Sequence, residues 1–179
     1  MAPGQLEQFR LMARYNRWMN GRLYELATEL SDEERRRDLG AFFGSIHATF
    51  NHLVLTDRIW LARFAEVGPA RDQFRGFELV YQYDSLAAEL YEDFGELRAQ
   101  REATDELIER WTRKLHPADL DAKMIYANSK GLEREHPLWF GMAHFFNHQT
   151  HHRGQLTTLF MQLGKDPGLT DFLVMHHLR

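Results

Sequence analysis

Apolar residues recur along the chain at the spacing expected for helices that are buried on one side. Four long stretches show this period, and the chain has no strong strand pattern. The stretches run from Leu6 to Leu30, Phe42 to Glu66, Ser85 to Leu115 and Pro137 to Leu163. The pattern therefore predicts an all-α fold, a four-helix bundle.

Local signals set the expected ends of these helices. Ser31 and Glu34 have the spacing of a capping box, so a short helical turn should follow the first helix. The pair at 68–69, Gly-Pro, should end the second helix. Ser85 should cap the start of the third helix, and Gly164 should end the fourth.

Two of the connections are long, which permits crossover connections instead of a simple up-and-down order. Residues 69–83 should form one loop, and residues 118–136 the other. The second contains a short β-prone run, 124–126, and a turn signal at 128–131, so we expect a small hairpin or loop between the third and fourth helices. The tail after residue 164 should pack back on the helices through Leu169, Phe172, Leu173 and Met175.

Composition narrows the class of protein. The 179 residues are 44% hydrophobic and 27% charged, so we expect a single globular domain over residues 1–179. The absence of cysteine excludes disulfides and thiolate metal sites. A net charge of −4 argues against a nucleic-acid partner. No run is long and apolar enough for a membrane span, and the start MAPGQLEQFR is not a signal peptide, so we expect a cytoplasmic protein.

The segment HFFNHQTHHRGQ, residues 144–155, holds four histidines. On a helical projection, His148 and His152 lie one turn apart at the margin of the apolar face, whereas His144 and His151 fall on its flank. Such a pair can place two ring nitrogens on one metal ion. Ten histidines in 179 residues make one pair of this spacing common by chance, so a proton relay or a polar helix face remains an alternative.

A third ligand could come from the second helix, which offers His47 and His52. They are five residues apart, about 140° around a helix, so both cannot point into one site. His47 lies beside the apolar stripe, and the projection slightly favours it as the buried residue. His52 lies on a small polar face that is either exposed to solvent or lines a pocket. A site of three nitrogens would suit Zn²⁺, Ni²⁺, Co²⁺ or Fe²⁺ and would leave a coordination position open.

Several other residues have a structural explanation that we prefer to a functional one. Asn16 and Asn20, one turn apart, could bind a ligand or join helices, and Arg153 is expected to be structural or part of a subunit contact. Trp60 should pack in the core or at its rim. Tyr126 should pack as well, although it could also cover a pocket.

Several segments of the chain resemble the DinB family, a group of DinB/YfiT-like metal-binding proteins. The resemblance covers nearly the whole chain and is carried by YNRWMNGRLY (15–24), SIHATFNHLVLTDRIWLARF (45–64), YANSKG (126–131), PLWFGMAHFFNHQTHHRGQL (137–156) and LGKDPGLTDFL (163–173). It implies a four-helix bundle with an unusual crossover topology. It also implies a divalent metal held by three histidines, one from the second helix and two from the fourth.

Carried over to this sequence, the resemblance implies that the ligands are His52, His148 and His152. His52 precedes the Asp57 and Trp60 of the family's motif, so the resemblance favours His52 over His47. Zinc or nickel is the expected metal.

The resemblance implies a reaction class less firmly than a metal. Some relatives are bacillithiol transferases or a mycothiol-dependent maleylpyruvate isomerase, in which a metal can hold a thiol as thiolate. We therefore expect a metal-dependent transferase or hydrolase with a small-molecule or low-molecular-weight thiol substrate. The alternative is a non-catalytic metal-binding stress-response protein in which the ion ties helices together.

We also expect a homodimer. The family often dimerises, and Phe146 and Phe160 fall outside the inward face of their helix on the projection. No nucleic acid or membrane is expected as a partner.

Overall fold

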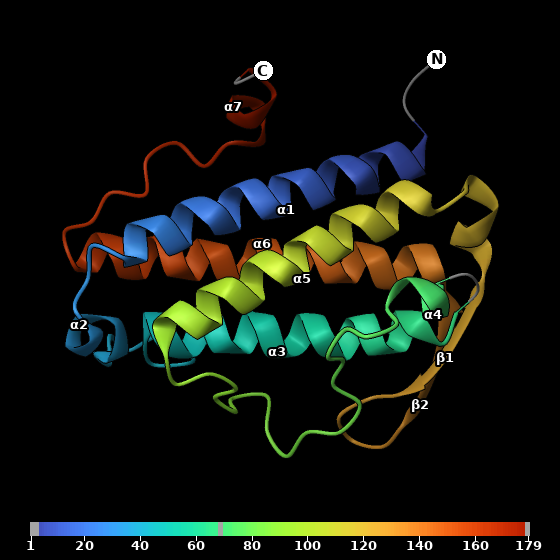
Figure 1. Cartoon of the computed structure of the whole chain (residues 1–179), viewed down its shortest axis with the longest axis horizontal. Helices are drawn as coiled ribbons and strands as arrows, with labels where there is room; N and C mark the ends of the chain where they lie inside the picture. The colour runs from blue at the N-terminus through green and yellow to red at the C-terminus, as the bar shows by residue number, and fades with distance from the viewer. Residues whose placement is uncertain (1–3, 68–69, 178–179) are drawn as a thin grey trace.

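The computed structural model describes residues 4–67 and 70–177, and helices dominate it (Figure 1). The four long helices are α1 (Gln5–Ala27), α3 (Ile46–Ala65), α5 (Phe94–Lys114) and α6 (Leu138–Gln162). Shorter elements are α2 (Asp32–Arg36), α4 (Ala70–Gln73), α7 (Phe172–His177) and a 3₁₀ turn at Pro117–Asp121. The all-α prediction is confirmed. No helix of the described residues is long and apolar enough to cross a membrane.

The long helices do not pack in the order in which they follow one another. α1 packs against α5 and α6, and α3 packs against the same two helices. In Figure 1, α5 and α6 accordingly lie between α1 and α3. The two consecutive helices α1 and α3 therefore lie diagonally across the core.

A small antiparallel hairpin precedes α6, as the sequence predicted. It consists of β1 (Lys123–Ala127) and β2 (Glu133–Pro137), paired so that Lys123 lies opposite Pro137. The hairpin approaches α6 closely at Gly141. A Cβ atom there would lie 3.0 Å from the sulfur of Met124 and 3.2 Å from the ring of Phe64, so the missing side chain makes room for the hairpin.

The predicted start of the third helix is wrong, because α5 begins at Phe94 and not after Ser85. Asp93 caps α5 by accepting the backbone N–H of Glu96 at 2.7 Å. The residues just before Asp93 are bonded to α3. The Asn51 side-chain oxygen accepts the backbone N–H groups of Leu90 and Tyr91, both at 2.9 Å. These bonds hold the segment as a loop along α3.

The other helix ends agree more closely with their signals. Ser31 and Glu34 form the predicted capping box, with bonds of 3.2 and 2.8 Å. Gly164 follows the end of α6 with a positive φ of 71°. α3 starts at Ile46, later than predicted, because Gly44 has a φ of 76° that a helix cannot contain. The predicted stop at 68–69 lies outside the described residues.

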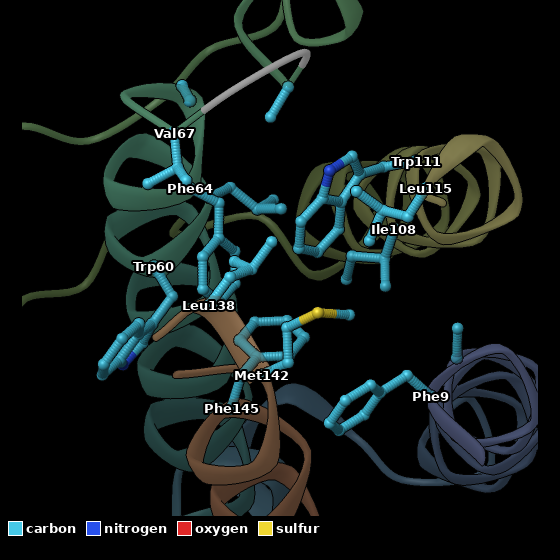
Figure 2. Packing of buried hydrophobic residues seen from close by; sticks show 14 of the residues in the cluster. Phe9, Trp60, Phe64, Val67, Ile108, Trp111, Leu115, Leu138, Met142 and Phe145 are labelled. Atoms are coloured by element: carbon cyan, nitrogen blue, oxygen red, sulfur yellow. The ribbon is translucent and has the colours of Figure 1, made fainter. Parts of the chain in front are cut away.

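Two apolar clusters fill the space between the four long helices. The first, at the hairpin end, includes Phe64, Trp111 and Phe145 (Figure 2). The second, at the α2 end, includes Phe50 and Leu156. Trp60 packs in the first cluster with 8% of its surface exposed, as predicted.

A layer of buried polar residues lies between the two clusters, and each long helix contributes to it. Its members are Asn16 and Asn20 of α1, Asp57 of α3, Arg101 and Asp105 of α5, and Gln149 and Arg153 of α6. We call this set the polar layer. All seven side chains are buried, so each must find its partners inside the protein.

Arg101 is the centre of the polar layer. Its guanidinium donates to Asp57 at 2.6 Å and to Asp105 at 2.8 and 3.1 Å. Asn16 and Asn20 donate to Asp105 at 3.1 Å, which confirms that these asparagines join helices. The carboxylates are therefore neutralised where water cannot reach them.

The other half of the polar layer links α6 to α1 and α3. Arg153 donates to Asn16, and at 3.3 Å to Gln149, which confirms its structural role. Gln149 donates to Asp57. Burial raises the pKa of Asp57 to about 6, although Arg101 opposes this shift, so the Asp57 carboxylate is charged above neutral pH.

The argument for a homodimer from apolar helix flanks is wrong. Phe146 and Phe160 are 2% and 0% exposed, because they pack in the first and second clusters. The helical projection drew the buried face of α6 too narrow, since α6 contacts both α1 and α3. The dimer itself stays a prediction.

The tail packs back on α1, but not through all of the predicted residues. Leu169 and Leu173 are 66% and 69% exposed. Phe172 contacts the ring of Tyr15 at 5.1 Å, and the Tyr15 hydroxyl donates to the carbonyl of Thr170 at 2.6 Å. One aromatic contact and backbone bonds therefore attach the tail.

The variant Arg101→Met should destabilise the fold strongly. It leaves Asp57 and Asp105 buried without their cation, and breaking a buried ion pair in this way costs about 3–5 kcal/mol. Urea unfolding followed by circular dichroism measures the loss. Arg98→Met is the matched control on α5, because Arg98 makes only more exposed ion pairs with Glu25 and Glu102, typically worth about 0–1 kcal/mol. Equal losses in the two variants would contradict the role assigned to the polar layer.

Candidate metal centre

Three histidines from two helices bring their ring nitrogens together at one point. The Nε2 atom of His52 on α3 lies 3.3 Å from that of His148 and 3.2 Å from that of His152, both on α6. The Nε2 atoms of His148 and His152 are 3.1 Å apart. In the part of the chain that the structure describes, this is the one group of histidine, aspartate and glutamate side chains that could hold a metal ion in this way.

The triangle of nitrogens has the size that a metal ion requires. Ligands placed tetrahedrally at about 2.0–2.1 Å from a zinc ion lie about 3.3–3.4 Å from one another. The observed separations of 3.1–3.3 Å are close to this value. The lone pairs of three nitrogens at these distances also repel one another unless a cation or a proton lies between them.

Hydrogen bonds on the outer side of two rings set which nitrogen faces the triangle. The Nδ1 atom of His52 lies 2.7 Å from the carbonyl of Leu86, and that of His152 lies 2.7 Å from Oε1 of Gln155. An oxygen of this kind only accepts, so Nδ1 carries the proton in each ring. In the neutral ring Nε2 then presents its lone pair inward, as metal ligation needs.

Burial keeps the three rings neutral. Loss of water contact, together with the charges of neighbouring histidines, lowers the pKa of His52 to about 4 and that of His148 to about 3. Burial also lowers the pKa of His152. A neutral imidazole does not have to lose a proton before it binds a cation.

The polar layer fixes the axial position of α6 relative to α3 beside this site. Gln149, the neighbour of His148, donates to Asp57, which follows His52 by five residues on α3. The i, i+4 spacing then places His152 one turn beyond His148 on the same side of α6.

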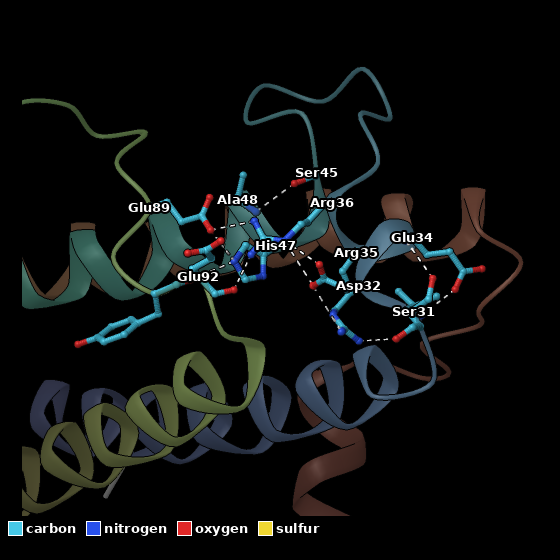
Figure 3. A network of polar contacts seen from close by, with 12 residues as sticks. Ser31, Asp32, Glu34, Arg35, Arg36, Ser45, His47, Ala48, Glu89 and Glu92 are labelled. Atoms are coloured by element: carbon cyan, nitrogen blue, oxygen red, sulfur yellow. Dashed lines mark hydrogen bonds and ion pairs between the residues drawn. The ribbon is translucent and has the colours of Figure 1, made fainter.

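His47 is buried like His52 but points elsewhere. Its Nε2 bonds the carbonyl of Tyr91 at 3.0 Å and a carboxylate oxygen of Glu89 at 3.1 Å (Figure 3). His52 is only 3% exposed, so the solvent-facing alternative for it is wrong. The projection treated the polar face of α3 as a surface, whereas the loop before α5 covers it through Leu86.

The remaining histidines of the motif lie outside the triangle, as the sequence indicated. His151 is exposed and meets His152 only edge to face, with ring centroids 4.8 Å apart. The ring centroid of His144 lies 4.8 Å from that of Trp60 and 6.0 Å from that of His148.

Three contributors to the site were not identified from the sequence. Phe43 stacks on His52 with ring centroids 3.9 Å apart and also lies 5.5 Å from the ring of His152. Gln155 follows His152 by three residues, a spacing that could have revealed it. Leu86 acts through its backbone, which leaves no signal in the sequence.

Two clefts lie along the helices that carry the histidines. One, of about 450 Å³, is lined by Gln155 and His151 of α6 and by residues 39–41. The other, of about 480 Å³, lies between α3, the hairpin and the loop at 80–83. Tyr126 lines this second cleft, so it does not only pack, as we expected, but also borders a pocket.

Comparison with known proteins agrees with this architecture. A sequence profile of the DinB family matches residues 4–179. The chain is also similar to "Protein DinB" of Bacillus subtilis (strain 168), with 26% identity over 163 residues, which cover 88% of this chain and 87% of that protein. No solved structure matches the chain. The all-α fold, the converging histidines and the match over nearly the full length lead to one conclusion: the chain belongs to the DinB family.

Proposed function

We propose that this protein binds a divalent zinc or nickel ion through His52, His148 and His152 and uses it as a metal-dependent enzyme of the transferase or hydrolase type. The observation that carries the proposal is the triangle of Nε2 atoms, 3.1–3.3 Å apart. Two of the three rings are held in the required orientation by Leu86 and Gln155.

The ligand set supports a catalytic ion more than a structural one. Structural zinc sites are closed by four protein ligands, whereas catalytic sites keep a position for water or substrate. The group found in the described residues has three members and no carboxylate. When bound, the ion would supply Lewis-acid chemistry, lowering the pKa of a water or thiol. The cleft lined by His151 and Gln155, next to His152, gives space for a small-molecule or low-molecular-weight thiol substrate.

The protein's own groups would hold and shield this site. Leu86 and Gln155 fix the rings of His52 and His152, so the ligands need little reorganisation on binding. Phe43 covers the ring of His52 and limits the access of water from that side.

The alternative is a non-catalytic protein in which the ion ties α3 to α6. It has less support, because these helices are already joined without an ion. Gln149 of α6 donates to the buried Asp57 of α3, and Leu61 and Phe64 of α3 share an apolar cluster with Phe145 of α6. An ion is therefore not needed to hold the two helices together.

Elemental analysis of untagged protein, followed by assays with several small thiols, tests the proposal. We expect one equivalent of zinc or nickel and transfer or hydrolysis that requires it. Protein that neither retains nor takes up metal would contradict the proposal, and metal without any such reaction would favour the alternative.

Substitution of the ligands should remove the ion selectively. His52→Ala, His148→Ala and His152→Ala should each lower metal content by at least tenfold, because two nitrogens hold a divalent ion poorly. His47→Ala and His151→Ala are the matched controls, since these rings lie on the same helices outside the triangle. Loss of metal in His47→Ala with retention in His52→Ala would reverse the assignment.

The stability given by the ion should persist to a lower pH than ordinary histidines would allow. Unfolded histidines have a pKa of about 6.5, whereas His52 and His148 in the fold have values of about 4 and 3. Below about pH 6.5 the unfolded chain therefore binds more protons than the folded apoprotein, so apoprotein stability falls as the pH drops towards these lower values. Protons compete with the ion in the folded protein only near those values.

Melting of metal-free protein, with and without added Zn²⁺, measures this difference. The gain in melting temperature should be nearly the same at about pH 7.5 and about pH 5.5 and should collapse towards about pH 4. A gain that vanishes already at about pH 6 would show that the ligands titrate as exposed histidines.

A further inference from the structure

The cleft beside the hairpin contains an arginine side chain surrounded by aromatic rings. It measures about 480 Å³ and is lined by Arg63 of α3, Tyr126 of β1, and Tyr81 and Tyr83 of the preceding loop. A volume of this order suits a small organic ligand. The lining residues come from α3, from the hairpin and its turn, and from the loop that joins α4 to α5. Figure 1 shows this loop beside the hairpin.

Arg63 is the charged group of this cleft that lacks a counter-ion of its own. Within the described residues, its guanidinium forms no ion pair. It lies over the rings of Trp60 and Tyr126, 4.7 and 4.4 Å from their centroids. Burial lowers its pKa, yet an arginine remains charged at neutral pH. Aromatic faces hold the guanidinium in place but leave its in-plane donors for an anion.

A series of ring contacts joins this cation to the histidine triangle. Trp60 lies under Arg63 and touches the ring of His144 at 4.8 Å, and His144 lies 6.0 Å from the ring of His148. The loop that lines the cleft at 80–83 continues to Leu86, which bonds His52.

We propose that Arg63 anchors a carboxylate of the substrate, so that the metal-dependent reaction acts on a small organic acid with an apolar or planar part. This inference rests on the proposed function. The guanidinium would take the carboxylate through paired N–H groups, while Tyr81 and Ile125, 64% and 52% exposed, would contact the apolar part.

One carboxylate opposes an anion here. Glu66 lines the same cleft one helical turn from Arg63 and is exposed, so its charge is screened by water. Arg63 is half-buried, and its charge is screened less. A carboxylate, which a guanidinium binds through two parallel N–H groups, is therefore the anion that this arrangement favours.

Fluorine NMR titration tests the anchor on metal-free protein with para-fluorobenzoate as the probe. Its neutral isostere, para-fluorobenzamide, has the same shape without the charge, and inorganic phosphate serves as the competing anion. We expect the benzoate to bind at least tenfold more tightly than the benzamide, and phosphate to displace it poorly. Arg63→Gln should abolish the difference, and Arg63→Lys should keep part of it.

Arg17→Gln is the matched control, because Arg17 is an arginine of α1 whose partners, Glu106 and Glu109, lie away from the cleft. It should leave benzoate binding unchanged. Melting curves check that each variant is folded. Equal affinity for benzoate and benzamide, or a preference that survives Arg63→Gln, would overturn the inference, as would displacement by phosphate at equal concentration.

Loading the protein with Co²⁺ tests the link to the histidines separately. A paramagnetic ion broadens and shifts the fluorine signal of a ligand bound near it, so the bound benzoate should be broadened in the Co²⁺ protein and not in the Zn²⁺ protein. If Co²⁺ leaves the signal of the bound probe unchanged, the cleft is not part of the site at the three histidines. Failure to load metal at all would refute the proposed function, while the titration of metal-free protein would still decide whether Arg63 binds an anion.

Discussion

The ion pairs of Arg101 with Asp57 and Asp105 are the constraint on which the rest of this structure depends. Charges buried between two apolar clusters must be paired, since each one left alone would cost several kcal/mol. Each of the four long helices contributes to the polar layer that pairs them. Apolar packing alone would tolerate a helix sliding along its neighbour. Hydrogen bonds and ion pairs are directional and do not tolerate such sliding, so the polar layer fixes the axial position of every long helix.

The geometry of the candidate metal centre depends on these axial positions of the helices. Asp57 accepts from Gln149, and the histidine before Gln149 is one of the three that converge. The loop before α5 supplies the other half of the geometry. Asn51 binds Leu90 and Tyr91 of that loop, and the carbonyl of Leu86 then turns the ring of His52 inward. The three histidines are thus positioned by an ion-pair layer on one side and a backbone segment on the other.

The sequence predicted the helices and the paired histidines of α6 well, because both follow from the period of a helix. The fourth helix, its Gly164 stop and the spacing of His148 and His152 needed no tertiary information. The start of α5 could not be predicted, since Ser85 has the chemistry of a cap, whereas the bonds from Asn51 hold Leu90 and Tyr91 as a loop against α3. His52 was found by resemblance alone. A projection describes one helix, and the loop that buries this polar face is distant in the sequence.

The diagonal placement of consecutive helices has a consequence for how the chain folds. α1 and α3 cannot form an early local hairpin, because each packs on α5 and α6. The bonds of the polar layer join residues far apart in the chain: 89 residues separate Asn16 from Asp105, and 137 separate Arg153 from Asn16. Most of the chain must therefore be made before the layer can close, and long loops must lose their freedom before any buried charge is paired. We expect this protein to fold slowly for an all-helical chain, at a rate nearer to that of mixed α/β domains.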